Sequence, residues 1–256
     1  MRSVRQGECL VPVAGIFMPW WGPAPGWESQ FIMRACALQS LEIILVGDAA
    51  GFEPSIGLKR IHCTMDEFEA RASEAAGVPV HKSTPGFGRG QCLCELRPMM
   101  ADMYPKAVAS YPWWGWGEWD CVWGDWDSYL TDERLDLYDM ISSASYTVNG
   151  PFTIFRNTPE FRQLYRKRME MVASATAQYH MDERGMQEVV VQEIAAGRML
   201  GLYPVDLDSH DRTEPWSRCA LKGNKLFRMD KTGNLGGELL NFHFPGTNRW
   251  PCHIAL

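Results

Sequence analysis

Short apolar runs alternate with segments of helical period through the first third of the chain. The runs end in turn or polar residues, which is typical of buried strands. The strand candidates are residues 9–17, 41–46 and 60–63. Residues 27–38 and 64–76 carry apolar side chains at helical spacing, and a capping box of Thr64 and Glu67 opens the second segment. This alternation of strands and helices predicts a parallel sheet with helices on its faces.

The rest of the chain mixes the two signals. The further strand candidates are residues 120–123, 139–142 and 152–155. The further helix candidates are residues 94–108, 131–138, 158–177 and 183–195. We expect Pro98 and Pro105 to interrupt the first of these helices, and we expect a hairpin around residues 231–234. No repeat or low-complexity linker divides the sequence, so we expect a single α/β domain over residues 1–256.

Net charge and hydrophobicity indicate which classes of binding partner the chain can have. The 256 residues carry a formal net charge of −6, so the chain lacks the positive field of proteins that bind nucleic acids. The apolar stretch at residues 9–21 contains Pro12, Gly15 and Pro19 and is shorter than the ~20 residues of a membrane span. The basic residues within 162–168 fit a solvated helix face, with a membrane-surface patch as the alternative. We therefore expect no nucleic-acid partner and no transmembrane segment.

Eight cysteines are spread along the chain. They lack the paired C-x-x-C spacing of zinc sites, and no convincing signal peptide accompanies them. Disulfide frameworks belong to oxidising compartments. We therefore expect reduced, mostly buried thiols in a cytoplasmic protein.

Tryptophan is unusually frequent, with six of the eleven tryptophans between Trp113 and Trp126. Such large aromatic side chains most often fill a core. The alternative is an exposed platform, because aromatic faces also bind the apolar side of sugar rings.

The segment Gly117-Glu118-Trp119-Asp120 carries the clearest chemical signal. Its two carboxylates are two residues apart at the end of an apolar strand, where alternate side chains point the same way. Clustered oxygen ligands suit a hard cation such as Mg²⁺ or Mn²⁺. The same triplet also fits a solvated turn, and Asp125 and Asp127 nearby fit caps of the helix that follows.

A longer stretch around this segment resembles a known family. The chain reads WWGWGEWDCVWGDWDSYLTDERLDLYDMISS and then NGPFTIFRNTPEF. This is similar to the central region of GT-A-fold glycosyltransferases of bacterial polysaccharide clusters and some large viruses. In that family, an aromatic–glycine pair leads into an acid–x–acid metal motif, an apolar strand, a Gly-Asp turn and a helix start. The match is close over residues 112–160 and looser in the first strands.

The resemblance implies the fold and the division of the chain. It implies a GT-A-like α/β fold, with a Rossmann-like, mostly parallel mixed sheet flanked by helices in one domain. Residues 1–120 are then the half that binds the nucleotide-sugar donor. Residues 121–256 are the acceptor half, with a metal-binding C-terminal tail.

The resemblance also implies metal ligands. Asp120 matches the second acid of the motif and is expected to bind Mn²⁺, or Mg²⁺, directly. Glu118 matches the first acid, usually Asp, which reaches the donor ribose or the metal, and the longer side chain departs from the family here. His243, in Asn241-Phe242-His243-Phe244, matches the histidine that completes the metal shell. The alternative for His243 is an ordinary core or edge residue.

Five further positions are donor-binding candidates. Trp20 or Trp21 follows the first strand, where a nucleotide base docks in the family, and Asp48 follows the second strand and fits a hydrogen bond to the base. Arg97, in a segment that resembles the family before Pro98, fits a bidentate diphosphate contact, with a surface salt bridge as the alternative. Arg249 fits a contact from a mobile tail that closes over the diphosphate.

A general base is expected at the start of the helix at 183–195. Asp182 and Glu183 resemble an acid pair that precedes a helix in GT-A enzymes, and Asp182 is the stronger candidate. The alternative for Asp182 is an ordinary N-cap. A base at this position favours inversion of the anomeric configuration. Asn149-Gly150-Pro151 departs from the family, where histidine often stands near this proline.

These features together predict a metal-dependent glycosyltransferase in polysaccharide biosynthesis. It would move a sugar from a UDP-sugar, or a GDP-sugar, to a saccharide acceptor. The alternatives are a nucleotide-sugar hydrolase and a non-catalytic carbohydrate-binding module. A Cys/His enzyme that uses Cys92 or Cys94 is a further alternative, although no activated pair is visible in the sequence.

Overall fold

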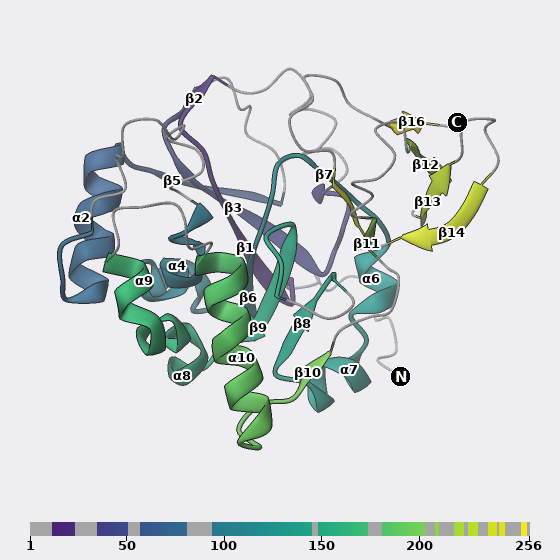
Figure 1. Cartoon of the computed structure of the whole chain (residues 1–256). Coiled ribbons are helices and arrows are strands. Elements are labelled where there is room, and N and C mark those ends of the chain that lie inside the picture. Colours follow the sequence, from purple (N-terminus) through teal and green to yellow (C-terminus); the bar gives the residue numbers. More distant parts are fainter. Residues whose placement is uncertain are drawn as a thin grey trace.

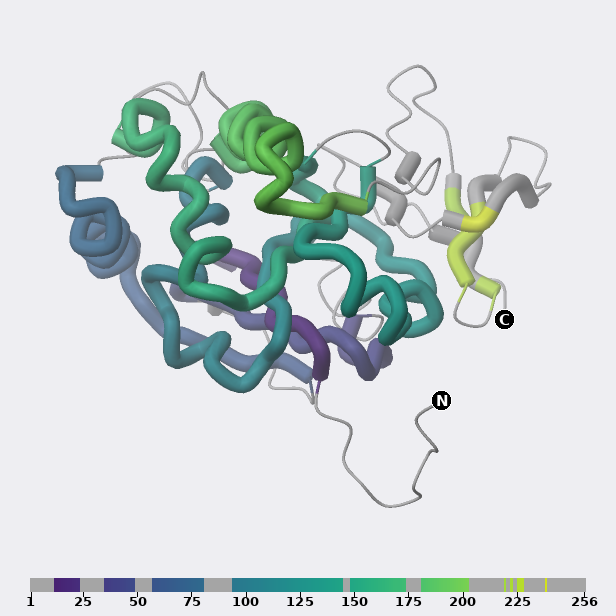
Figure 2. Tube along the Cα trace, turned by 90° about the horizontal axis from the view of Figure 1, so that it is seen from below, coloured from purple at the N-terminus to yellow at the C-terminus, as the bar shows by residue number. Residues whose placement is uncertain are grey.

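The structure of the chain is a computed structural model (Figures 1 and 2). It describes residues 12–23, 35–50, 57–80, 94–144, 148–173, 181–202, 208–209, 218–222, 225–229, 235–239, 241–243 and 252–254. Most of the expected helix at 27–38 and the expected turn at 231–234 lie outside these residues.

A seven-stranded mixed sheet forms the centre of the structure (Figure 1). The strands lie in the order β10-β8-β9-β6-β1-β3-β5. Their bounds are Gly201–Leu202, Met140–Ser142, Phe152–Arg156, Trp113–Gly117, Ala14–Pro19, Leu41–Gly47 and Leu58–His62. Strands β5, β3, β1 and β6 are parallel, and β9 runs antiparallel to both β6 and β8. The expected α/β class with a mostly parallel mixed sheet is confirmed.

Alternation along the strands gives the sheet two apolar faces. In β6, Trp114 and Trp116 pack with Phe155 in one core, whereas Trp113 lies in a second core on the opposite face. The helices α2 (Met65–Ala76) and α10 (Met186–Ala195) cover the first face. The short helices α6 (Trp126–Tyr129) and α7 (Asp132–Leu137) lie over the second (Figure 1). The sheet is therefore flanked by helices on both faces, as expected.

The tryptophan-rich segment is part of these cores. Its six tryptophans are at most 5% exposed. The backbone here is also tightly packed, since a Cβ on Gly115 would lie 2.1 Å from the carbonyl oxygen of Thr153. The packing interpretation of this cluster is confirmed, and the exposed platform is not what these six residues form.

The expected N-terminal caps of α2 and α6 are present, whereas Asp127 does not cap a helix. The capping box of Thr64 and Glu67 begins α2, and Gly77 ends the helix with a φ of 71°. Asp125 caps α6 by accepting a hydrogen bond from the backbone N–H of Ser128. Asp127 instead accepts hydrogen bonds from the chain just before β3, including the N–H of Ser40 at 2.8 Å. The expectation that Asp127 caps the following helix was wrong, because this long-range contact uses its carboxylate.

The expected helix at 158–177 is broken where the structure describes it. It consists of α8 (Pro159–Arg162), a 3-10 turn η2 (Leu164–Arg168) and α9 (Met169–Ala173). The hydroxyl of Tyr165, in η2, donates to Asp102 at 2.6 Å and lies 3.0 Å from the carbonyl oxygen of Ala75. We attribute the break to these tertiary contacts, because the sequence of this segment alone favours a continuous helix.

Two other expected helices also differ from regular geometry. Residues 94–108 form the 3-10 turn η1 (Arg97–Met99), α4 (Met100–Met103) and α5 (Pro105–Val108), so the expected interruption at the prolines is confirmed. The helix expected at 183–195 begins earlier, with a π-helical turn η3 (Met181–Gly185) before α10. Such π turns are rare and often lie at functional sites.

The described residues also form three smaller sheets, and one of them is built entirely from the tail. Strands β12 (Arg218–Lys222), β13 (Lys225–Met229) and β14 (Leu235–Leu239) are antiparallel, and β16 (Cys252–Ile254) adds to β12 in parallel. The β13–β14 pair flanks the expected hairpin turn. Figures 1 and 2 both place these strands on the side of the molecule away from α2. Strand β15 (Asn241–His243) lies between β7 (Cys121–Trp123) and β11 (Asp208–Ser209), and β2 (Gly22–Pro23) pairs with β4 (Ala49–Ala50).

Cys219 departs from the expectation of reduced thiols. Cys219 forms a disulfide bond, whereas Cys63 is a free, buried thiol. The expectation of reduced thiols was therefore wrong for Cys219. The expectation of a cytoplasmic location depended in part on reduced thiols, and Cys219 does not support it. Within the described part of the chain, no helix combines the length and apolar character needed to span a bilayer.

Candidate functional site

The candidate residues from the first half of the chain come together at one edge of the central sheet. Strands β1, β3 and β6 are parallel neighbours, so their carboxyl ends share this edge. Trp20 and Trp21 follow β1, Asp48 follows β3, and Glu118 and Asp120 follow β6. Ligands of open α/β sheets bind beyond this edge. The structure therefore places these five residues after strands whose carboxyl ends lie at one edge of the sheet.

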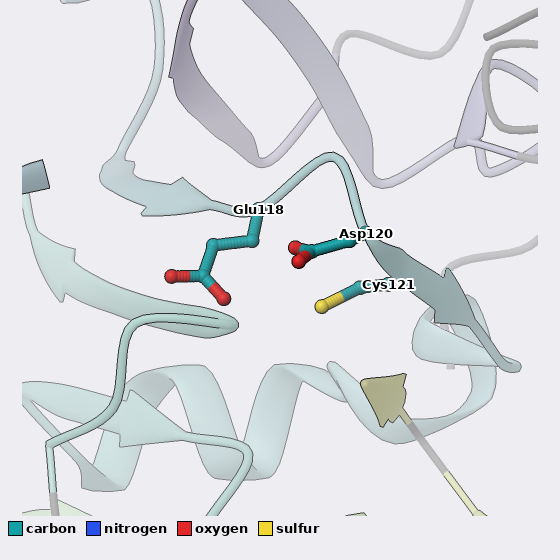
Figure 3. A group of neighbouring side chains, drawn as sticks. All are labelled: Glu118, Asp120 and Cys121. Atoms are coloured by element: carbon teal, nitrogen blue, oxygen red, sulfur yellow. The ribbon is translucent and has the colours of Figure 1, made fainter. Parts of the chain in front are cut away.

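The acid motif forms a compact set of donor atoms. Carboxylate oxygens of Glu118 and Asp120 and the Sγ of Cys121 all lie within 4.8 Å of one another. Figure 3 shows these three side chains pointing toward the same space. The two acids are partly exposed and Cys121 is buried.

Cys121 was not among the expected site residues. Strict period-two alternation would point it away from Asp120. However, β6 ends at Gly117 and β7 begins at Cys121, so a turn lies between the strands and breaks the alternation. The signal available in the sequence was the adjacency of a thiol to the acid pair.

Strand β15 brings His243 to the same place. It pairs antiparallel with β7, and His243 is the partner of Cys121 in the register. The backbone of His243 is thus beside the acid motif although the two are far apart in sequence. The side chain of His243 lies outside the described part of the structure, and so does all of Arg249.

Arg97 is buried in the middle of the site and bridges two carboxylates. Its Nη2 donates to Glu118 Oε1 at 2.8 Å and to Asp182 Oδ2. The side chains of Arg97 and Asp182 are each 3% exposed. We call Arg97, Glu118 and Asp182 the Arg97 cluster. The surface salt bridge considered for Arg97 from the sequence is not what it forms.

Burial decides the protonation of Asp182. Loss of hydration raises the pKa of its carboxyl to about 7, against the opposing effect of the Arg97 guanidinium, and nearby carboxylates including Glu183 raise it further. The ordinary N-cap interpretation does not describe this residue, because its carboxylate accepts from Arg97 and no side chain caps α10. A carboxyl group with a pKa near 7 is suited to proton transfer at neutral pH.

Two further acids surround the Arg97 cluster. Glu183 Oε1 accepts a hydrogen bond of 3.2 Å from the N–H of Gly150. Glu95 is 3% exposed and accepts from the N–H of Met181, the residue before Asp182. Glu95 was not among the expected site residues, although it lies in the segment around Arg97 that resembles the family.

Gly150 allows this packing. A Cβ there would lie 2.6 Å from Glu118 Oε1, 3.0 Å from Arg97 Nη2 and 3.1 Å from Glu183 Oε1. The first distance is shorter than real contacts of a Cβ, so any larger residue would displace the cluster. The segment in which the sequence departs from the family is therefore part of the site.

The aromatic donor-binding candidates lie close to the acid motif and are partly used in packing. The ring of Trp20 packs edge-on against Trp119, the residue between the two acids, with centroids 6.3 Å apart. Trp21 packs against Phe68 with centroids 4.9 Å apart, and its indole N–H donates to the carbonyl of Cys63 at 3.0 Å. Trp20 is therefore the one whose ring contacts the acid motif.

Asp48 is exposed at the same edge. Its carboxylate lies 3.8 Å from His62 Nδ1, and both side chains are well exposed. Gly47 before it has a φ of 134°, and a Cβ there would lie 2.1 Å from the carbonyl oxygen of Trp20. Glycine at this position lets the chain segments after β1 and β3 approach each other closely.

The structure gives evidence against two alternatives, a Cys/His enzyme that uses Cys94 and a membrane-surface patch at the basic residues within 162–168. Burial raises the pKa of the Cys94 thiol to about 12, with Arg97 opposing this effect, whereas a nucleophilic cysteine needs a lowered pKa. Cys92 lies outside the described residues. Arg166, Lys167 and Arg168 form ion pairs with acidic side chains, as a solvated helix face does.

Comparisons with known proteins give little beyond the family. No curated protein matches the chain. The apo crystal structure of mouse xyloside xylosyltransferase 1 is similar with a TM-score of 0.39 and 10% identity, over 94% of this chain and 99% of that chain. The glycosyltransferase GlyE of Streptococcus pneumoniae TIGR4 is similar with a TM-score of 0.35 and 12% identity, over 75% of this chain and 45% of that chain. Both likenesses are too weak to support a function. The family is clear, however: a family model matches residues 16–210, and the chain belongs to DUF6625, a family of unknown function.

Proposed function

We propose that this protein is a metal-dependent glycosyltransferase. It transfers a sugar from a nucleotide diphosphate sugar, with UDP favoured and GDP as the alternative, to a saccharide acceptor in polysaccharide biosynthesis. The observation that carries the proposal is the link, through Arg97, between the acid pair at the sheet edge and a buried carboxyl in the turn before α10. Glu118 and Asp120 form a cation-ligand set with Cys121, and Asp182 is a buried carboxyl beside it with a pKa near 7.

The donor set fits a divalent cation. Two carboxylates and a thiol within 4.8 Å supply ligand atoms for Mn²⁺, and oxygen atoms alone would suit Mg²⁺. Asp120 is the proposed direct ligand, and Glu118 shares its charge with Arg97. His243 is proposed as an additional ligand because its strand pairs with β7. When bound, the cation stabilises negative charge on the departing nucleotide diphosphate.

The nucleotide is proposed to bind along the edge formed by β1 and β3. Trp20 or Trp21 stacks on the base, and Asp48 accepts a hydrogen bond from a base N–H. Arg249, from the tail, is proposed to contact the diphosphate. The exposure of Asp48 and the contact of Trp20 with Trp119 support a nucleotide that extends from this edge to the acid motif.

Asp182 is the proposed general base, with Glu183 beside it. A base must lose its proton to act, and a pKa near 7 leaves a substantial fraction of Asp182 ionised at neutral pH. It would take the proton of the acceptor hydroxyl as the oxygen attacks the anomeric carbon. The nucleotide diphosphate leaves from the opposite face, so the configuration inverts.

Thermal stabilisation by donor and metal tests the proposal. Mn²⁺ together with one class of nucleotide sugar is expected to raise Tm, because a ligand that binds only the folded state stabilises it. Asp120→Ala should abolish this shift and lower kcat more than about 100-fold, a loss larger than that for outer-shell partners of a metal. Glu193→Gln, a change of a carboxylate outside the site, is the matched control and should retain both.

The products distinguish the remaining alternatives. Release of free sugar from the donor with acceptor present would indicate a nucleotide-sugar hydrolase. Glycan binding without metal that survives Asp120→Ala would indicate a carbohydrate-binding module. The proposal fails if no nucleotide sugar shifts Tm and none is consumed in the presence of Mn²⁺.

A further inference from the structure

We propose that Arg97 is the positioning residue of this site, holding Glu118 and Asp182 in fixed places relative to each other. This rests on the proposed function, in which Glu118 belongs to the metal side and Asp182 is the base. It replaces the diphosphate contact expected of Arg97 from the family resemblance.

The guanidinium is fixed by the backbone as well as by the carboxylates. Arg97 Nη1 donates to the carbonyl oxygen of Gly150 at 3.0 Å and lies 3.5 Å from that of Gly117. Nε lies 3.4 Å from the carbonyl oxygen of Cys94. The planar group is thus held by three separate segments, one of which, Gly117, directly precedes Glu118.

A single nitrogen of this fixed group serves both acids. Nη2 donates to Glu118, which follows β6, and to Asp182, which lies in the π turn before α10. Because they share one nitrogen, the two carboxylates lie close together, and they would repel each other without a cation between them. One side chain therefore links Asp182 directly to the acid motif.

Lysine cannot reproduce this arrangement. Its ammonium is a single point charge on a flexible stem, whereas arginine presents several donors in a rigid plane. Arg97→Lys retains the charge and loses the geometry. Arg97→Gln leaves the buried carboxyl of Asp182 without a cation and is prone to misfolding, so the lysine variant is the informative one.

Gly150→Ala disturbs the same geometry without a change of charge. Its new Cβ would meet Glu118, Arg97 and Glu183 at 3.1 Å or less. Gly77→Ala is the matched control, because it strains the left-handed end of α2 in open space far from these residues in the fold. An effect on kcat in the first variant and only on Tm in the second separates positioning from general stability.

The kinetic test compares kcat with donor affinity. Arg97→Lys and Gly150→Ala are each expected to lower kcat about 10- to 100-fold, because misplacement of a reacting group by about 1 Å can cost 100-fold. Donor KM, and Kd measured by calorimetry, should stay within about 3-fold of wild type. A rise in donor Kd with unchanged kcat would show that Arg97 binds the donor, and the inference would be overturned.

The pH profile gives a readout that a purely structural role would not change. Four charged side chains act on the carboxyl of Asp182. They are Arg97 in η1, Glu118 at the end of β6, Glu95 in the segment before η1, and Glu183 in the same turn as Asp182. A cation that moves away from Asp182 no longer lowers its pKa, so the acidic limb of kcat should move to higher pH in Arg97→Lys. An unmoved limb would count against the inference.

Stability separates a failure of this inference from a failure of the proposed function. Unfolding free energies of Arg97→Lys, Asp182→Asn and the double variant should be non-additive, and likewise for Arg97→Lys with Glu118→Gln. These couplings are expected even if the wild type proves inactive on every donor. Additive effects in both pairs would overturn the inference whatever the activity is.

Discussion

Two groups of ion pairs in this protein contain the same kinds of side chain, but their carboxyl pKa values shift in opposite directions. In the Arg97 cluster one buried guanidinium serves two carboxylates, Glu118 and Asp182. On α10, Glu193 receives ion pairs from two partly exposed cations, Lys167 and Arg198. We call these last three residues the Glu193 cluster.

The two clusters shift their carboxyl groups in opposite directions. Burial raises the pKa of Asp182 to about 7 although Arg97 is in contact with it. Hydrogen bonds from Arg198 and Lys167 lower the pKa of Glu193 to about 2. The number of cations per carboxylate and their access to water decide the direction. The carboxylate of Glu193, which receives two cations, stays ionised at neutral pH. The buried carboxyl of Asp182, which has other carboxylates around it and a pKa of about 7, can exchange a proton at neutral pH.

The largest expected difference between the clusters is in activity. Asp182→Asn removes the proposed base with little change in shape and should lower kcat by about 10²- to 10⁴-fold. Glu193→Gln, the equivalent change in the Glu193 cluster, should leave kcat unchanged. Steady-state rates with the best donor measure both, and equal effects of the two variants would remove the functional distinction.

The next difference is the sign of the pH dependence of stability. The pKa of Asp182 is raised on folding, so its contribution is fully present below about pH 4 and is lost as pH rises to about 7. The slope is at most about 1.4 kcal/mol per pH unit for one proton. Asp182→Asn should flatten this decline in unfolding free energy, measured by urea titration between pH 4 and 8.

Glu193 should show the reverse. Its pKa is lowered on folding, so its contribution is present above about pH 4.5 and is lost as pH falls toward 2. Glu193→Gln should flatten the stability curve only in this acidic range. If Glu193→Gln flattened the range above pH 5 instead, the assignment of the two pKa shifts would be wrong.

The smallest expected effect is at a cation of the Glu193 cluster. Lys167→Ala leaves Arg198 in place and exposes its neighbours to water, so Tm should change by no more than about 3 °C. The effect should weaken further in high salt because exposed charges are screened. A larger change measured by calorimetry would mean that the exposed cations of the Glu193 cluster are as important for the fold as the buried Arg97.

Local patterns in the sequence predicted the elements whose causes are local. The apolar runs predicted β1, β3 and β5, and the capping box predicted the start of α2, because apolar runs and caps depend on neighbouring residues. The acid pair at the end of β6 was also readable, since strand ends in a parallel sheet share an edge. The residues Glu118 and Asp120 could therefore be selected from sequence and family resemblance together.

Features that depend on distant residues were not predictable in this way. The helical pattern at 158–177 gave no sign of the contacts of Tyr165 with Ala75 and Asp102 that accompany the break. Arg97 looked like a surface or ligand-binding residue because its partners, Glu118 and Asp182, are far from it in the chain.

The sequence by itself thus determined the α/β class and several of the main strands, and with the family resemblance it singled out the acid pair. Only the tertiary structure decided that Cys121 joins the acids, that Gly150 leaves room for them and that Asp182 is buried against Arg97. The reason is physical: propensity and periodicity act over a few residues, whereas burial and charge balance arise only when distant segments exclude water together.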